Sequence, residues 1–361
     1  RSTLLASSAA SGVYKRQMVE RIKIIGVANS PYTRKMLSIL RYKHIPYEVH
    51  WGDVAAHLSQ LGIEPPRPIL LPTVLLKNKE NIYEAVTDTT PIIRRLENDY
   101  PARNTIPEDP ALSFINYLLE DFGDEWVTKY MFHYRWHFEE DADNAGTILP
   151  LSHAVNLPED IHSDFKSIVA KRQIDRLWVV GSSDKTAALI DSSYKRFLKL
   201  LEDHLSVCPF LLGNKPSSAD FSIFGQLTQL VGFDPTSRKI AHEISSRTVA
   251  WVDIMEDLSG INPNESNWTT LENSPETLKE ILKEVGKVYV PALLQNDKAV
   301  KQNADTWEAE INGSTWKQKT FNYQAKCLSW IRDEFEKLND ADKSRVIKYI
   351  DGTGCENLLK I

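Results

Sequence analysis

Apolar positions along the first hundred residues switch between two periodicities. The run "IKIIGV" (22–27) is continuous and rich in β-branched residues, which is typical of a buried strand. Helical spacing follows from Pro31 and stops before Pro46. The pattern then predicts a strand at 47–51, a short helix at 53–62, a hairpin of "TVLLK" (73–77) and "NIYEA" (81–85), and a helix that begins at Asp88 or Thr89. This order indicates a compact α/β unit over residues 21–100.

The pattern changes after a polar, proline-rich stretch at 101–110, which we interpret as a linker. Beyond it, helical spacing dominates to the end of the chain. The predicted helices cover roughly 111–141, 160–178, 184–205, 217–231, 238–258, 274–295, 297–311 and 315–338. The expected fold class is therefore α/β plus all-α, with an all-helical domain over 111–361 that includes a C-terminal extension from about 261.

The first residues are set apart by composition. Residues 1–17 are rich in Ser and Ala and contain Arg and Lys but no acid, which is compatible with the remnant of a mitochondrial presequence. The periodic pattern begins only at Ile22, so we favour sequence that precedes a natural start at Met18. We treat residues 1–20 as a leader outside the fold.

Composition narrows the class of protein. Apolar residues make up 42% and charged residues 25% of the 361, as in a soluble globular protein. The net charge of −6 argues against nucleic acid or a membrane surface as a partner. Cys208, Cys327 and Cys355 form neither a disulfide framework nor a metal-ligand spacing, so we expect a cytoplasmic protein without a metal.

The segment "NSPYTRKM" (29–36) poses the question of chemistry. Ser followed by Pro suits a helix N-terminus, because the hydroxyl accepts an orphan backbone N–H and Pro fits the first helical position. By itself, Ser30 is thus explained as a helix cap. A helix N-terminus also favours an anion, so Ser30 is equally a candidate for holding a reactive thiolate.

Four motifs favour a catalytic role for Ser30, because together they indicate a resemblance to a known family. They are "IKIIGVANSPYTRKM", Leu71-Pro72-Thr73, "VTDTTPIIRRLE" and "FLLGNKPSSADFSIFGQL". In this order and spacing the chain resembles the glutathione transferases, which implies an N-terminal thioredoxin-like domain followed by a helical domain. The resemblance places Ser30 at the position of the catalytic serine of serine-type members. The chain also resembles larger bacterial-type members that have a C-terminal extension.

The resemblance also implies a glutathione site. It implies that Leu71, followed by a cis Pro72, binds the cysteinyl backbone of glutathione. It also implies that Asp88 and Thr89 bind the γ-glutamyl group. Many members carry Gln or Lys where this chain has Leu70, so we assign the glycine carboxylate to Arg67. Ser217 and Asp220 form a capping box that resembles a structural motif of the family, and we assign it no chemistry.

An aromatic stripe in the first long helix offers candidates for the second substrate. The family binds that substrate against this helix, so the resemblance implies a pocket of Tyr32, Tyr130, His133, Tyr134 and Arg135. The same helical spacing equally indicates core packing. The expected function is a homodimeric detoxifying glutathione transferase with glutathione as co-substrate and a hydrophobic electrophile. The alternative is a non-catalytic glutathione- or ligand-binding protein on the same scaffold.

Overall fold

The computed structural model describes residues 21–262 and 267–360. The N-terminal domain has a four-stranded sheet in the order β2-β1-β3-β4, in which β1 runs parallel to β2 and antiparallel to β3. Its elements, in chain order, are β1 Ile22–Gly26, α1 Pro31–Tyr42, β2 Tyr47–Trp51, α2 Val54–Leu61, β3 Thr73–Lys77, β4 Tyr83–Val86 and α3 Thr89–Asp99. The predicted α/β unit and its element order are confirmed. The predicted leader at 1–20 lies outside the described residues.

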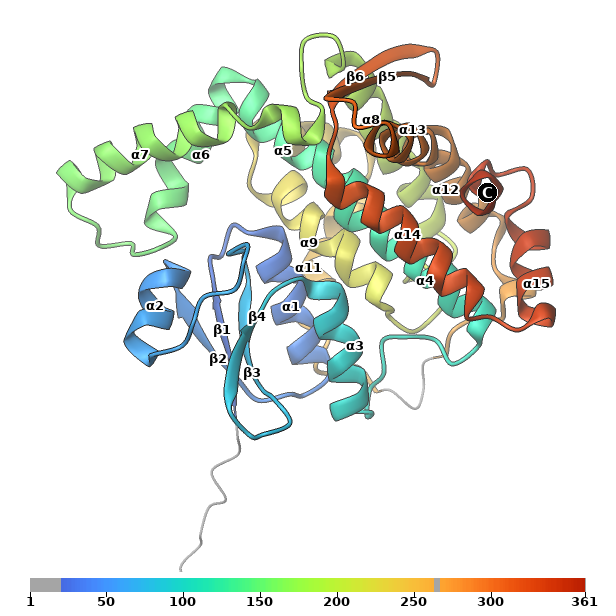
Figure 1. The fold of residues 1–361 in the computed structure, drawn as a ribbon, viewed down its shortest axis with the longest axis horizontal. Helices are drawn as coiled ribbons and strands as arrows, with labels where there is room; N and C mark the ends of the chain where they lie inside the picture. Colours follow the sequence, from blue (N-terminus) through green and yellow to red (C-terminus); the bar gives the residue numbers. More distant parts are fainter. Residues whose placement is uncertain (1–20, 263–266, 361) are drawn as a thin grey trace, which may run out of the picture.

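Alternating residues divide the sheet into two faces. Ile24 and Val74 on one face join the main core with α1 and α3, whereas Ile25 and Leu75 on the other face pack against α2. In Figure 1, α1 and α3 lie between the sheet and the helical region, and α2 lies on the far side of the sheet. The main core thus runs continuously from the sheet into the helical region.

The helical region begins after the linker. Its helices are α4 Pro110–Phe122, α5 Thr128–His137, α6 Glu139–Leu151, α7 Glu159–Ile174, α8 Ala187–Leu205, α9 Ser218–Gly232, α10 Pro235–Ile244, α11 Ser246–Met255, α12 Glu276–Glu284, α13 Val290–Lys301, α14 Asn322–Glu336 and α15 Asp340–Ile350. A π-helical turn at Gly123–Val127 joins α4 to α5, so the long first helix predicted at 111–141 is locally widened. The helix predicted over 238–258 is divided at Ser245, which caps α11.

The structure corrects one element of the region predicted as all-helical. Residues 306–319 form a β-hairpin, β5 Thr306–Ile311 and β6 Ser314–Lys319, where one helix was expected over 297–311 and the start of another over 315–338. The turn at Asn312-Gly313 has positive φ at both residues, 48° and 73°. Asn-Gly between alternating apolar residues is a strong hairpin signal, and it overrides the helical spacing of the preceding residues.

Candidate active site

Strand register brings three predicted site segments to one end of the sheet. Ile25 near the end of β1 pairs with Thr73, the first residue of β3, and Val74 pairs with Val86, the last residue of β4. The loop before Ser30, the Leu71–Pro72 segment and the Asp88–Thr89 segment each adjoin one of these strand ends. Segments separated by almost 60 positions therefore lie at the same end of the sheet, because the two strand pairs are antiparallel.

Ser30 occupies the N-cap of α1, as the sequence predicts. Its extended backbone (φ −96°, ψ 122°) lets Oγ accept the Thr33 N–H at 3.3 Å, and Pro31 takes the first helical position. The residue is 7% exposed. A hydroxyl that accepts one bond still has its own proton to donate. The cap and the catalytic interpretations of Ser30 are thus compatible.

Asp88 and Thr89 begin α3 and are already engaged by protein groups. Asp88 has a φ of 73°, its Oδ1 accepts the Thr90 N–H at 3.2 Å, and its Oδ2 accepts the Tyr323 hydroxyl at 3.0 Å. Thr89 Oγ1 accepts a hydrogen bond from Lys35 Nζ at 3.1 Å. Tyr323 comes from the C-terminal extension, so that segment reaches the predicted γ-glutamyl site.

Lys35 links the two helix starts through a buried ionic cluster that the sequence analysis missed. Its ammonium, on α1, also contacts Glu120 Oε1 at 3.0 Å and Asp124 Oδ2 at 2.7 Å. Arg94 of α3 contacts Glu120 Oε2 at 2.8 Å. Burial would raise the pKa of Glu120, but Arg94 and Lys35 hold it at about 2.

The signal for this cluster was present in the sequence. Lys35 lies on the apolar face of α1 among Met36 and Ile39, and Glu120 and Asp124 lie within an apolar stretch of the first long helix. Charged residues at core positions are rarely buried without a partner. Opposite charges at predicted core positions of two helices therefore indicated an ion pair between the domains.

Two further carboxyl groups near the start of α3 have unusual protonation. Burial, with the nearby Asp124 charge, raises the pKa of Asp121 to about 7, although the hydrogen bond from Tyr289 at 2.5 Å opposes the shift. Burial and the charges of Asp121 and Asp124 raise the pKa of Glu125 to about 8. The start of α3 thus faces an acidic surface of α4 and the π-helical turn.

The loop before β3 agrees in part with the expected site. The Leu71–Pro72 bond is cis, as the resemblance implies, and so is the Arg67–Pro68 bond. Leu71 is half-buried and Pro72 is buried, whereas Arg67 is exposed. Leu70, which replaces the usual polar residue, is 44% exposed. The role of Arg67 stays a prediction.

The aromatic stripe belongs to the core. Tyr130, His133 and Tyr134 are each fully buried. Tyr130 contacts Ser193 at 2.6 Å, His133 contacts Ser182 at 2.7 Å, and Tyr134 donates to Asp191 at 2.7 Å; all three partners lie between 182 and 193. This corrects the expectation that these side chains line a second-substrate pocket, because they expose no surface to a substrate. The core-packing alternative holds.

Arg135 is corrected in the same way, yet it touches the site loop. Its buried guanidinium forms an ion pair with Asp234 at 2.8 Å and lies over the Phe233 ring, 4.6 Å from the centroid. Nη1 donates to the Asn29 carbonyl at 3.2 Å, immediately before Ser30. Arg135 therefore braces the loop that carries Ser30.

Tyr32 lies at the junction of the two domains. It is half-buried, and its hydroxyl donates to the Asp124 carbonyl at 2.8 Å. Burial, together with Glu125 and Asp124, raises the pKa of its phenol well above the usual value. Of the five residues predicted for the second-substrate pocket, Tyr32 is the one that is partly exposed. It lies two residues after Ser30.

The capping box of α9 is formed as predicted. The Asp220 carboxylate accepts the Ser217 N–H at 2.8 Å and the Ser217 hydroxyl at 2.7 Å, and it also accepts the Leu211 N–H at 2.8 Å. Both residues are fully buried. Burial raises the pKa of Asp220 to about 6. Because every partner is inside the helical region, the motif is structural.

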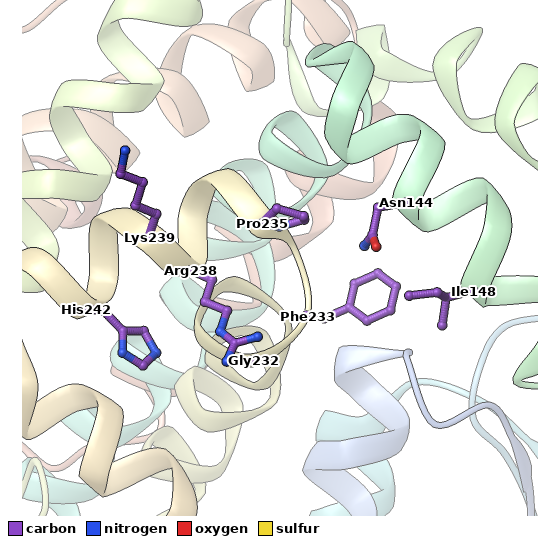
Figure 2. A pocket seen from close by; sticks show the side chains of 8 residues that line it. All are labelled: Asn144, Ile148, Gly232, Phe233, Pro235, Arg238, Lys239 and His242. Carbon is purple, nitrogen blue, oxygen red and sulfur yellow. The ribbon is translucent and has the colours of Figure 1, made fainter.

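Two surface hollows lie outside the predicted glutathione site. The first, about 550 Å³, is shown in Figure 2, where Ile148 of α6 points toward the Phe233 ring while Arg238, Lys239 and His242 project from α10. The second, about 620 Å³, is bordered by residues 61–66 and 82–85. Ser30, Asp88 and Thr89 line neither of these two hollows.

Over 21–262 and 267–360, no group of three or more His, Cys, Asp or Glu side chains is arranged to hold a metal ion. Within the same ranges, none of the helices has the length and apolar character needed to cross a membrane.

Comparisons with known proteins point to one family. Residues 24–104 match the family model described as the glutathione S-transferase N-terminal domain. A GST-like protein from Pseudomonas syringae is 17% identical over 65% of this chain and 66% of that chain, with a TM-score of 0.41. No curated protein matches the sequence.

Two other solved structures contain glutathione. A glutathione transferase family member from Pseudomonas fluorescens, with two glutathione bound, is 17% identical over 70% of this chain and 95% of that chain, with a TM-score of 0.40. A glutathione S-transferase from Ceriporiopsis subvermispora in complex with glutathione is 18% identical over 68% of this chain and all of that chain, with a TM-score of 0.43. Residues 24–104 are thus similar to the glutathione S-transferase N-terminal domain, and a helical region follows them.

Proposed function

We propose that the chain is a glutathione transferase in which Ser30 activates the glutathione thiol. The observation that carries this proposal is the Ser30 hydroxyl at the N-terminus of α1. It accepts from Thr33 N–H and keeps its own proton free to donate, at the same end of the sheet as cis Pro72 and Asp88. The positive end of the helix and this hydroxyl both favour a sulfur anion over the neutral thiol.

The proposed reaction transfers the glutathionyl group to carbon. The thiol proton passes to solvent, and Ser30 donates a hydrogen bond to the resulting thiolate. The sulfur electron pair then forms an S–C bond with an electrophilic carbon of a hydrophobic co-substrate, and the leaving group departs with the electrons of the broken bond. The enzyme forms no covalent bond to either substrate.

The remaining groups of glutathione have partners around the same sheet end. The backbone of Leu71 would pair with the cysteinyl unit, Asp88 would accept the γ-glutamyl ammonium, and the start of α3 at Thr89 would donate to its carboxylate. Arg67 is the proposed partner of the glycine carboxylate. A cytoplasmic homodimer is the proposed form of the enzyme.

A non-catalytic glutathione-binding protein is the second candidate function. It is favoured by the burial of Tyr130, His133 and Tyr134, which removes three side chains from the expected co-substrate pocket. Two measurements separate the candidates: retention on immobilised glutathione, and conjugation of glutathione to a model aryl halide. Retention together with conjugation supports the transferase, and retention alone supports the binding protein. A chain that shows neither retention nor conjugation would contradict both candidate functions.

A further inference from the structure

The C-terminal extension places one side chain on the predicted γ-glutamyl site. Tyr323 lies in the first turn of α14, 235 positions after Asp88, and its hydroxyl donates to Asp88 Oδ2 at 3.0 Å. Its ring lies 5.8 Å from the Trp330 ring in an edge-to-face arrangement. Figure 1 shows α14 running alongside α4, with its start directed toward the end of the helical region that faces the sheet domain.

The position of Tyr323 is fixed by buried hydrogen bonds rather than by chance contact. Asn296 of α13 is fully buried, and its side chain accepts the Phe321 N–H at 2.9 Å and donates to the Phe321 carbonyl at 2.8 Å. Trp307 of the β5–β6 hairpin donates to the same Asn296 oxygen at 3.1 Å. The hairpin and α13 thus hold the start of α14 in place.

Several carboxyl groups lie around Tyr323. Asp88 contacts it directly, and the charge of Glu125 from the π-helical turn also acts on it. Asp121 and Asp124 act together with Asp88 and Glu125 on Cys327, one turn further along α14. Lys129 is the cation that faces Glu125. Burial and the charges of Glu125 and Asp88 raise the pKa of the Tyr323 phenol, so it stays a donor.

We propose that Tyr323 is a specificity-determining residue of the glutathione site, which it completes from the C-terminal extension. By donating to Asp88 Oδ2, it holds the carboxylate in the orientation that receives the ligand's γ-glutamyl ammonium. Oδ1 is occupied by the Thr90 N–H, and Oδ2 keeps a second lone pair for the ammonium. This inference rests on the proposed function, because it assigns a selecting group to the same site.

The selectivity follows from what each ligand offers to Asp88. Glutathione brings an ammonium that pairs with the oriented carboxylate. An otherwise identical peptide with a glutaryl group in place of γ-glutamyl has no ammonium, so it leaves Asp88 unpaired and gains nothing from its orientation. Tyr323 should therefore matter for the first ligand and not for the second.

The test is calorimetric titration of the full chain with both ligands. Tyr323→Phe removes the hydroxyl and keeps the ring, so it should weaken glutathione binding by about 10-fold, as loss of a hydrogen bond to a charged group does. Affinity for the glutaryl analogue should change by less than about 2-fold. Tyr349→Phe, on α15 with its ring under Lys279, is the matched control and should change neither affinity.

Each other outcome contradicts the inference in a different way. Equal glutathione affinities in wild type and Tyr323→Phe would remove Tyr323 from the site but leave the transferase proposal standing. Tighter binding by the variant would make the phenol an obstruction that glutathione must displace. Equal losses for both ligands would reduce Tyr323 to a structural contact. A wild type that binds neither ligand would overturn this inference together with the proposed function.

Discussion

Two helix N-termini in this chain lie at the same end of one sheet but have different capping residues, one neutral and one acidic. The start of α1 has Ser30 at its cap, no acid in its first turn, and Arg34 and Lys35 immediately after it. The start of α3 has Asp88 at its cap and faces the carboxyl groups of Asp121 and Glu125. Both helices present the same positive dipole end.

The contrast shows how one fold separates the charges of a single ligand. At α1 the capping residue Ser30 is an uncharged donor, so the positive end of the helix favours an anion such as a thiolate. At α3 the capping residue Asp88 is itself a carboxylate, so an ammonium can pair with it at the positive end of the helix. Lys35 joins the two ends, because it is part of α1 and bonds to Thr89 of α3. Changes at either end, or between them, test this account.

The largest expected effect comes from breaking the link between the two helix starts. Glu120→Gln leaves Lys35 and Arg94 with less negative charge in a site where the Glu120 side chain is 1% exposed. Removing one partner of a buried ion pair typically costs about 3–5 kcal/mol, and we expect a loss at the lower end, because Asp124 still neutralises Lys35. Urea denaturation at pH 7 measures the change in the free energy of unfolding.

The pH dependence of this loss sharpens the test. The pKa of Glu120 is depressed to about 2, so its contribution is present above the usual value near 4.5 and is lost as the pH falls toward 2. The difference between wild type and Glu120→Gln should therefore shrink over that interval. Asp175→Asn, which breaks an exposed pair with Lys171, is the control and should cost less than about 1 kcal/mol. A constant difference across the interval would contradict the assignment.

The second largest effect is expected at the anion end. Ser30→Ala removes the donor to the thiolate and should lower the conjugation rate by about 10²–10³. Glutathione affinity should change much less, since the carboxylates of the peptide bind elsewhere. Ser38→Ala on the same helix removes a hydroxyl that bonds to the Met255 carbonyl, and it should leave the rate within about 2-fold. An unchanged rate in Ser30→Ala would return Ser30 to a simple helix cap.

A smaller effect is expected at the ammonium end. Asp88→Ala removes the partner of the γ-glutamyl ammonium, and loss of one member of a hydrogen-bonded charge pair costs at least about 2 kcal/mol, or roughly 30-fold in the dissociation constant. Calorimetric titration with glutathione measures it. Asp53→Ala removes the N-cap of α2 instead, where the carboxylate accepts the Ala56 N–H, and serves as the matched control. If both variants bind like wild type, Asp88 is only a cap.

The smallest effect is expected at a third helix start, which has no ligand to hold. Ser217→Ala at α9 removes one bond to Asp220 and should lower the free energy of unfolding by about 0.5–2 kcal/mol. Glutathione affinity of the folded protein should stay the same. A loss of affinity without a change in melting temperature would mean that α9 acts on the site and is more than a structural cap.

The sequence predicted the sheet domain well because its signals are local. Strand composition and the Ser30 and Asp88 caps each act within a few residues, and all appear in the structure. The motif that contains Pro72 predicted the cis bond only through the family resemblance. The start of α1 could therefore be predicted almost completely.

The predictions failed where the deciding contacts are distant in sequence. Aromatic spacing in the first long helix is the same for a core and for a pocket, and burial of Tyr134 depends on the segment 182–193 and its neighbours. Contact between Tyr323 and Asp88 joins two segments with no pattern in common. The hairpin was a different failure, because its Asn312-Gly313 turn was visible and outweighed the apparent helical spacing.

The central claim is that Ser30 and the start of α1 stabilise a thiolate, and the pKa of bound glutathione tests it most directly. Thiolate absorbance, followed during a pH titration of the complex, reports this pKa for wild type and Ser30→Ala. We predict a value at least about one unit below the ordinary thiol value of roughly 8.5 in wild type, and a return toward that value in Ser30→Ala. The same thiol pKa in both proteins would contradict the account.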